Sequence, residues 1–329
     1  MLYLHGIGHF HPENIISNQF LEDLDIGTTE EWILERVGIN TRRTVLPLDY
    51  IRTTRNRDVR AAFEAAMYNN IQTGAAAARM ALQRAGLKPK DIGLVVSGSC
   101  TPDTLTPAES ATIAAELGIE APCLDINSAC STFGMQINIL DSMKTEALPP
   151  YVLVVNPENM TRSVDYSDRK IAVLFGDGSS AAVVSAAVPA KKAFLSCFYD
   201  SKPSAWEKVS IPRLGYFQQD GNAVQRFAIH KTTESLRLLR EAFPFDGNRL
   251  KFVGHQANLS MLNTVCERAD LSPENHWHNV TQYGNTGCSG APAVLSQHWE
   301  DLQPGQHVAI SLVGAGLTWT HMMLKVEEE

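Results

Sequence analysis

Continuous apolar runs alternate with amphipathic stretches along the whole chain. Amphipathic spacing predicts one helix through Phe133, Ile137 and Leu140 and another over 236–243. The apolar runs predict strands at 2–8, 92–97, 123–126, 151–155, 171–175, 193–199, 251–254, 307–313 and 317–326. This alternation predicts an α/β fold, and β-branched runs such as 152–155 predict interior strands covered on both faces.

A softer break in the pattern lies near 186–192, where Ala, Pro and Lys follow one another. Strand and helix content is comparable on either side, and the sequence has no tandem repeat, low-complexity tract or Gly/Ser linker. The internal similarity is too weak to establish a duplication. We expect two similar halves, 1–188 and 189–329.

Composition excludes several classes of protein. With 44% hydrophobic and 19% charged residues, the 329-residue chain can bury a large core. Its 28 basic and 36 acidic residues give a net charge of −8, which disfavours nucleic acid and anionic membranes as partners. No apolar run approaches the roughly 18–20 residues that cross a bilayer, and the start lacks the basic flank of a signal peptide. We expect a cytosolic protein.

The six cysteines form no CxxC pair and no zinc-like spacing, so no metal site is expected. Cys130 differs from the others in its setting, because a short predicted strand runs through small residues into it and an amphipathic helix follows. A thiol at a helix N-terminus is stabilised as a thiolate, which makes Cys130 a candidate nucleophile. On this segment alone, a small core cysteine at a strand-to-helix corner is an equally weighted alternative.

Three further segments carry candidate chemistry. His255 follows a predicted strand end, where sites collect in α/β folds, although a lone histidine is more often structural. Asn285 lies in the turn-forming stretch 283–292. The stretch 314–316 is Gly-Ala-Gly, which places bare backbone between two strands where N–H groups can face a ligand oxygen.

In this order and spacing, the four segments together resemble the thiolase superfamily, and within it the β-ketoacyl-ACP synthase III group. The resemblance covers nearly the whole chain, through Gly6, 31–33, Arg36, 38–39, 125–134, 168–169, 175–178, 255–258, 284–286 and 314–319. It implies a thiolase-like fold of two similar βαβαβαββ halves packed as five layers, αβαβα.

The resemblance also implies an acyltransferase mechanism. Cys130 would take an acyl group from acyl-CoA, and His255 and Asn285 would act on a malonyl-ACP or malonyl-CoA thioester in a decarboxylative Claisen condensation. The N–H groups of Cys130 and Ala315 would form the oxyanion hole. This chemistry requires no metal, nucleotide or redox cofactor, and family members of this kind are homodimers.

Positions that bind coenzyme A in the family are present. Trp32 and Arg169 match residues that stack on adenine, and Arg36 matches a residue near phosphate. The pantetheine channel is matched by Gly221, Ala257 and Asn258. Thr106 stands where many members have an aromatic residue that projects from the partner subunit into the acyl pocket, and its smaller size suggests room for a longer or polar acyl chain.

The chain departs from the family at sites that concern carrier binding. Ser260 replaces a basic residue that helps to dock acyl carrier protein. An insertion between 43 and 74 concentrates arginines at 42, 43, 52, 55, 57 and 60. This segment either attracts an acidic carrier or coenzyme A phosphates, or forms a solvated, salt-bridged surface; the two are weighted equally.

Two acidic positions require interpretation. The related hydroxymethylglutaryl-CoA synthases have a Cys-His-Glu catalytic set, which draws attention to Glu109. We nevertheless expect Glu109 to be a solvated carboxylate at a helix N-terminus. The segment 176–178, Gly-Asp-Gly, lacks the lysine and Ser/Thr of a phosphate-binding loop and is interpreted as a tight structural turn.

Other functions remain as alternatives. One is a specialised secondary-metabolite ketosynthase that joins two acyl or β-ketoacyl chains in a head-to-head or pyrone-type condensation. Another is a non-catalytic homologue that only binds a partner, which Cys130, His255 and Asn285 argue against. A papain-like protease shares the Cys, His and Asn set but not the glutamine and aromatic context of its nucleophile.

Overall fold

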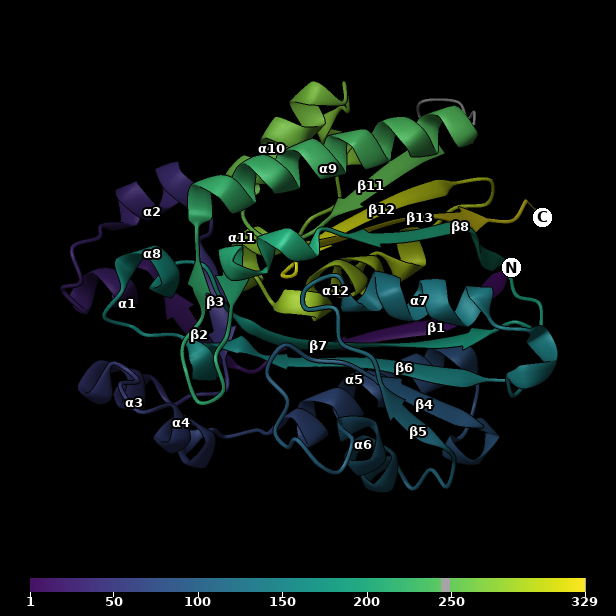
Figure 1. Cartoon of the computed structure of the whole chain (residues 1–329), viewed down its shortest axis with the longest axis horizontal. Helices are drawn as coiled ribbons and strands as arrows, with labels where there is room; N and C mark the ends of the chain where they lie inside the picture. Colours follow the sequence, from purple (N-terminus) through teal and green to yellow (C-terminus); the bar gives the residue numbers. More distant parts are fainter. Residues whose placement is uncertain (244–248, 329) are drawn as a thin grey trace.

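The computed structural model describes residues 1–243 and 249–328 (Figure 1). Its main sheet has the strand order β11 (Leu250–Gly254), β12 (His307–Gly314), β13 (Thr318–Val326), β8 (Lys192–Ser201), β1 (Leu2–Phe10), β7 (Asp177–Ser185), β6 (Val152–Asn159), β4 (Leu94–Ser97) and β5 (Cys123–Asp125). Two small ribbons pair β2 (Asn14–Ser17) with β3 (Thr41–Thr44) and β9 (Val209–Ser210) with β10 (Gln218–Gln219).

Helices pack on both faces of this sheet. In chain order they are α1 (Asn18–Asp23), α2 (Glu30–Val37), α3 (Leu48–Thr54), α4 (Val59–Ala65), α5 (Asn70–Ala85), α6 (Glu109–Leu117), α7 (Thr132–Ser142), α8 (Arg169–Ala172), α9 (Gly221–Ala242), α10 (Leu259–Arg268), α11 (Val280–Tyr283) and α12 (Gly290–Gln297). None of the helices in the described ranges is long and apolar enough to cross a membrane.

The elements form the five layers that the resemblance implies. In Figure 1, α9 and α10 cover the upper strands β11, β12, β13 and β8. Below, α5 and α6 cover the lower strands β1, β7, β6, β4 and β5. The middle layer consists of α7, which contacts β8, β13 and β6, and α12, which contacts β1, β7 and β11. The predicted α/β thiolase-like fold is confirmed.

The upper and lower parts of the sheet are joined by a short strand pairing, between β8 and β1. β1 pairs with β7 along most of its length, but with β8 only through Leu2↔Phe194 and Tyr3↔Ala193. The loop between β7 and β8 coincides with the break expected at 186–192. The division into halves 1–188 and 189–329 stays a prediction.

Local packing explains why these residues form these elements. Residues 152–155 in β6 are fully buried, as expected for an interior strand that is covered on both faces. A Cβ at Gly6 or Gly8 would overlap the backbone of Ala81 or Ala77, so glycine is required where β1 lies against α5. On α7, the predicted face of Phe133, Ile137 and Leu140 is buried in the core.

Two sequence-based assignments are wrong. The expected strand at 171–175 is helix α8 followed by a turn, because the Asp168 side chain accepts a hydrogen bond from the Lys170 N–H and caps a helix there. The expected tight turn at 176–178 contains the start of β7 at Asp177, a strand that the pattern missed. β7 is buried throughout, but its first four residues are Asp, Gly, Ser and Ser, and its apolar run is confined to 181–184.

Candidate active site

Cys130 lies in a rigid turn between β5 and α7. Ala129 adopts a left-handed φ of 48°, and Cys130 stands two residues before α7 begins at Thr132. The Ser131 hydroxyl bonds those of Ser128 at 2.9 Å and Thr318 at 2.8 Å, and the Ser128 N–H donates to the Thr132 hydroxyl at 2.8 Å. These bonds join the cysteine turn to β13.

The thiol of Cys130 does not have the low pKa expected from its place before a helix. A hydrogen bond with the Cys100 thiol and burial raise the pKa of Cys130 well above its usual value, whereas a hydrogen bond with His255 lowers it. The shift is therefore opposite in direction to the sequence-based expectation, because contact with another thiol and removal from water oppose the helix N-terminus. Contact with Cys100 and burial therefore favour the thiol over the thiolate.

His255 approaches this thiol from the other part of the sheet. It follows β11 directly, and its backbone N–H donates to the Ser311 carbonyl of β12 at 2.9 Å. The side chain is buried and hydrogen-bonded to Cys130, while its Nδ1 has no partner among the described residues. The structure thus brings together two predicted site residues that are 125 positions apart in the sequence.

Asn285 lies in a buried loop held to α8 and the start of β7. Its N–H donates to the Leu174 carbonyl at 2.9 Å, and its carbonyl accepts the Gly176 N–H at 3.1 Å. The side-chain Oδ1 accepts the Gly287 N–H at 3.0 Å, which leaves Nδ2 as a donor without a protein acceptor in the described part of the chain. Cys288 of the same loop is hydrogen-bonded to Cys100, so the loop reaches the nucleophile's surroundings.

The backbone at Gly314 and Ala315 packs directly on the cysteine turn. A Cβ at Gly314 would lie 2.9 Å from the Ser128 carbonyl oxygen and the Ser131 nitrogen. The Thr318 hydroxyl donates to the Ala315 carbonyl at 3.1 Å. The absence of a side chain at Gly314 therefore permits this close approach.

The predicted coenzyme A residues of α2 and α8 meet at the surface. The Arg169 guanidinium lies 5.1 Å and that of Arg36 lies 5.9 Å from the Trp32 ring centroid, within the range of cation–π contact. Arg169 also donates to the Gly27 carbonyl at 2.5 Å. These three side chains form one cluster of an aromatic ring and two cations.

The other predicted channel residues lie at helix starts. Gly221 is the first residue of α9, and Asn258 caps α10 by accepting the Met261 N–H at 2.8 Å. Ala257 precedes Asn258, and its N–H donates to the His255 carbonyl at 2.8 Å. Thr106 is not part of this site in the single chain, because it lies on an exposed loop and its hydroxyl donates to the Leu105 carbonyl at 2.9 Å.

Two charged residues differ from expectation. Glu109 is 2% exposed instead of solvated, because its Oε1 accepts hydrogen bonds from Asn70 Nδ2 at 2.8 Å and the Asp103 N–H at 3.1 Å. Burial raises the pKa of Glu109 to about 8. Arg42 belongs to the core instead of a basic surface, since it is fully buried and donates to the Val173 carbonyl and to Asn18.

Sequence reasoning missed Cys100, which is hydrogen-bonded to the nucleophile, and Glu158, which binds Cys100. Glu158 is fully buried at the end of β6, and its carboxylate accepts the N–H of Cys100 at 2.8 Å and that of Cys288 at 3.1 Å. Cys100, Glu158 and Cys288 are far apart in the sequence, so no spacing pattern could have grouped them.

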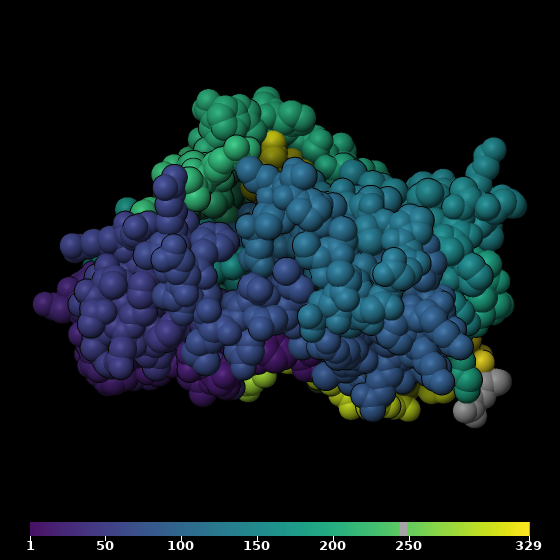
Figure 2. All heavy atoms as spheres, turned by 90° about the horizontal axis from the view of Figure 1, so that it is seen from below, coloured from purple at the N-terminus to yellow at the C-terminus, as the bar shows by residue number. Residues whose placement is uncertain are grey.

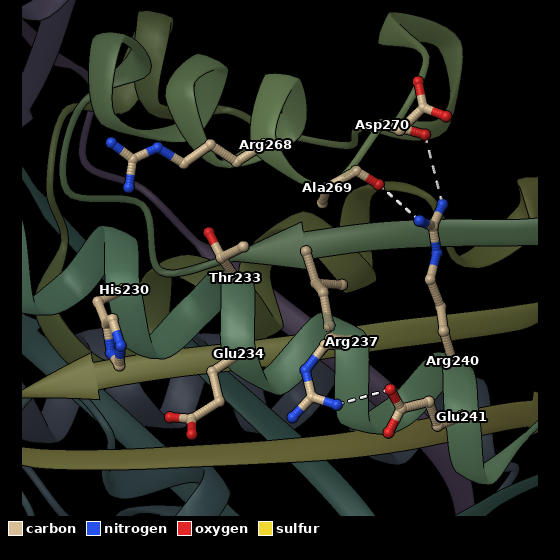
Figure 3. Close-up of a pocket in the computed structure, with 10 residues that line it drawn as sticks. His230, Thr233, Glu234, Arg237, Arg240, Glu241, Arg268, Ala269 and Asp270 are labelled. Carbon is tan, nitrogen blue, oxygen red and sulfur yellow. Dashed lines mark hydrogen bonds and ion pairs between the residues drawn. The ribbon is translucent and has the colours of Figure 1, made fainter.

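A surface groove of about 720 Å³ lies between α9 and α10, away from these residues (Figure 3). Two of its arginines are already bonded, Arg237 to Glu241 at 2.6 Å and Arg240 to the Ala269 carbonyl at 2.5 Å. Its lining includes none of the predicted site residues. The groove is therefore separate from the chemistry at Cys130.

Comparisons with known proteins identify the family of this chain. The family model for 3-oxoacyl-[acyl-carrier-protein] synthase III matches residues 124–203, and the model for its C-terminal part matches 250–326. The β-ketoacyl-[acyl-carrier-protein] synthase III of Campylobacter jejuni subsp. doylei is 30% identical, over 98% of this chain and 97% of that protein.

Solved structures give the same result. The crystal structure of 3-oxoacyl-[acyl-carrier-protein] synthase III from Aquifex aeolicus matches with a TM-score of 0.87 and 27% identity, over 99% of this chain and 100% of that chain. The priming β-ketosynthase of the R1128 polyketide biosynthetic pathway matches with a TM-score of 0.82 and 28% identity, over 100% and 97%.

A thiolase-like fold with these relatives defines a condensing enzyme that transfers acyl groups. The chain belongs to the 3-oxoacyl-[acyl-carrier-protein] synthase III family, whose members are acyltransferases of the β-ketoacyl synthase type.

Proposed function

We propose that this enzyme forms an acyl-cysteine at Cys130 from acyl-CoA and condenses it with a malonyl thioester. The observation that carries this proposal is the hydrogen bond between the Cys130 thiol and the His255 imidazole. Covalent catalysis of this kind divides one difficult carbon–carbon bond formation into two easier steps.

In the first step, the Cys130 sulfur attacks the thioester carbonyl of acyl-CoA. Because the pKa of Cys130 is raised, the thiol loses its proton as it attacks, and the neighbouring imidazole of His255 is the group that can accept it. The N–H groups of Cys130 and Ala315 would hold the oxyanion, which the close packing of Gly314 on the cysteine turn supports. The thiol of coenzyme A then leaves with a proton.

In the second step, His255 and Asn285 act on the malonyl thioester. The free Nδ2 donor of Asn285 and a ring N–H of His255 would stabilise the enolate charge that develops as carbon dioxide leaves. The resulting carbanion attacks the acyl carbonyl on Cys130, and the thiol is released. Acyl-CoA enters this scheme as substrate, and no step requires another cofactor.

The cluster of Trp32, Arg36 and Arg169 is proposed to bind the nucleotide end of coenzyme A. An indole face and a planar guanidinium can hold an adenine ring between them, and a second guanidinium can pair with phosphate. Gly221, Ala257 and Asn258 would line the channel to Cys130. Asn258 already caps α10, so its contribution there would come from the side-chain atoms that the cap leaves free.

Carrier docking is proposed to involve the α3–α4 segment, which forms part of the molecular surface at one end of the face in Figure 2. Several of its arginines are engaged: Arg52 pairs with Asp49 at 2.9 Å, and Arg55 donates to the Leu24 carbonyl at 2.9 Å. Arg57 and Arg60 are exposed, and their guanidinium groups have no partner among the described residues. They are the charges left to attract an acidic carrier.

A homodimer is proposed from the free edge of the sheet. β5 is the last strand in the sheet order and lies beside solvent, with Leu124 41% exposed. On the stretch between β4 and α6, Leu105 is 69% exposed, next to Thr106. A second copy that covers these side chains would bring Thr106 into the partner's acyl pocket, as the family resemblance implies.

A specialised ketosynthase is the second candidate. The similarity to a priming β-ketosynthase of a polyketide pathway favours it, as does the small Thr106 at the expected acyl pocket. Both candidates share the acyl-cysteine and differ in the second substrate.

Intact-protein mass spectrometry after exposure to a panel of acyl-CoAs tests the proposal and ranks the chain lengths. The protein should gain one acyl mass, and Cys130→Ala should gain none. His255→Ala and Asn285→Ala should still acylate but should release no β-ketoacyl product with the malonyl substrate. If they lost acylation to the same degree as Cys130→Ala, the proposed division of roles would be wrong.

A further inference from the structure

Three free cysteines form one cluster at the nucleophile. The Cys100 thiol is hydrogen-bonded to the thiols of both Cys130 and Cys288. Cys288 is 1% exposed, whereas Cys100 and Cys130 are partly exposed. The condensation proposed above uses only Cys130, so two nucleophilic side chains in its surroundings have no role in that chemistry.

Glu158 holds the cluster together. One carboxylate oxygen accepts the Cys100 N–H at 2.8 Å and the other accepts the Cys288 N–H at 3.1 Å. The Cys288 thiol is further fixed by a bond of 3.4 Å to the Gly98 carbonyl. Cys100 lies in the irregular stretch between β4 and α6.

We propose that Cys100 is a resolving thiol, which forms a reversible disulfide with Cys130 when a hydroperoxide oxidises the nucleophile. This inference rests on the proposed function only in taking Cys130 as the nucleophile. The geometry favours Cys100 over Cys288, because Cys100 is the thiol that is hydrogen-bonded to Cys130.

The chemistry balances in two steps. The Cys130 sulfur attacks one peroxide oxygen, an S–O bond forms, the O–O bond breaks, and the leaving hydroxide takes the thiol proton as water. The Cys100 sulfur then attacks the Cys130 sulfur of the sulfenic acid, an S–S bond forms, the S–O bond breaks, and a second water leaves with the Cys100 proton. Two thiols lose two electrons, and hydrogen peroxide is reduced to two waters.

Such a disulfide would block acylation and protect the nucleophile. A sulfenic acid that meets no second thiol is oxidised further to sulfinic and sulfonic acids, which ordinary thiol reductants do not reverse. The contact with Cys100 and burial raise the pKa of Cys130. The contact with Cys130 lowers the pKa of Cys100, but the contact with Cys288 and burial raise it well above its usual value, so the reaction should be slow and needs excess peroxide.

The test treats the reduced full-length enzyme with hydrogen peroxide and maps the product without reductant. Residues 91–143 contain no lysine or arginine, so trypsin leaves Cys100 and Cys130 on one peptide, and they must be separated by cleavage at glutamate and aspartate, for example after Glu109 and at Asp125. We expect a link between the Cys100 and Cys130 peptides, loss of two hydrogen atoms in the intact mass, and loss of acylation that dithiothreitol restores.

Two variants test whether Cys100 protects Cys130 from further oxidation or is only located near it. Cys100→Ser should acylate when reduced, but after peroxide its Cys130 should gain two or three oxygen atoms. The acylation that dithiothreitol then restores should be about one fifth of the wild-type value or less. Cys288→Ser is the matched control and should form the same link and recover fully. If Cys100→Ser does not fold, Cys100→Ala replaces it.

Several results would overturn the proposal. They are the absence of any disulfide, a link between Cys100 and Cys288 with Cys130 still able to acylate, or equal recovery in the wild type and Cys100→Ser. Failure of the proposed function is distinguishable, because it would show as a reduced enzyme with no acyl adduct, whatever the peptide map shows.

Discussion

Glu109 should make the stability of this enzyme fall as pH rises above 5. Its pKa is raised from 4.5 to about 8 by burial, so between these values the folded chain keeps a proton that the unfolded chain loses. The favourable contribution is complete below the unfolded pKa and disappears as pH rises through the folded one. Linkage then gives a loss of about 1.4 kcal/mol per pH unit, or about 5 kcal/mol over the interval.

Glu109→Gln mimics the protonated acid and should remove this dependence. The substituted side chain keeps an oxygen that can accept the bonds from Asn70 and Asp103. We therefore consider the difference between the two free energies of unfolding, wild type minus Glu109→Gln. This difference should decline by about 1.4 kcal/mol per pH unit between about pH 5.5 and 7.5.

Urea denaturation of both proteins at several pH values and one protein concentration measures this difference, in which all other titrating groups cancel. Glu116→Gln is a matched control on the same helix, because its carboxylate is 43% exposed and forms only a surface pair with Arg79 at 2.8 Å. A difference between wild type and Glu109→Gln that stayed constant with pH would refute the reasoning.

Further expectations concern ligand binding, the core and docking. Trp32→Ala and Arg169→Ala should each raise the KM for acyl-CoA about five- to tenfold through lost ring stacking, with little change in kcat, and initial rates test this. Phe133→Ala should lower the free energy of unfolding by about 3–5 kcal/mol in urea titrations, because the ring is 1% exposed. Reversing the charge at Arg57 and Arg60 should raise the KM for the carrier-bound substrate and leave that for acyl-CoA unchanged; an unchanged carrier KM would remove the docking idea.

Much of the fold could be predicted because interior strands have a strong signature. Residues 152–155 are β-branched or leucine and fully buried, and the pattern identified them. β7 was missed because its first half consists of Asp, Gly and Ser, and its apolar residues are limited to the short run 181–184. At 171–175 a local cap by Asp168 overrode the apolar pattern and produced a helix.

The candidate site was predictable in part. The segments around Cys130, His255 and Asn285 have a distinctive order and spacing, and the fold brings the first two into contact; their catalytic roles stay predictions. The high pKa of Cys130, the burial of Glu109 and the bridging by Glu158 depend on contacts between residues distant in sequence. Periodicity and spacing carry no information about such contacts.

The narrow junction between β1 and β8 has a consequence for how activity appears during folding. The cysteine turn belongs to one side of that junction and the imidazole to the other, with only two residue pairs holding the neighbouring strands in register. Catalysis can therefore begin only after both sides have docked correctly. Recovery of turnover in a refolding experiment would report the last assembly event, later than any signal from secondary structure.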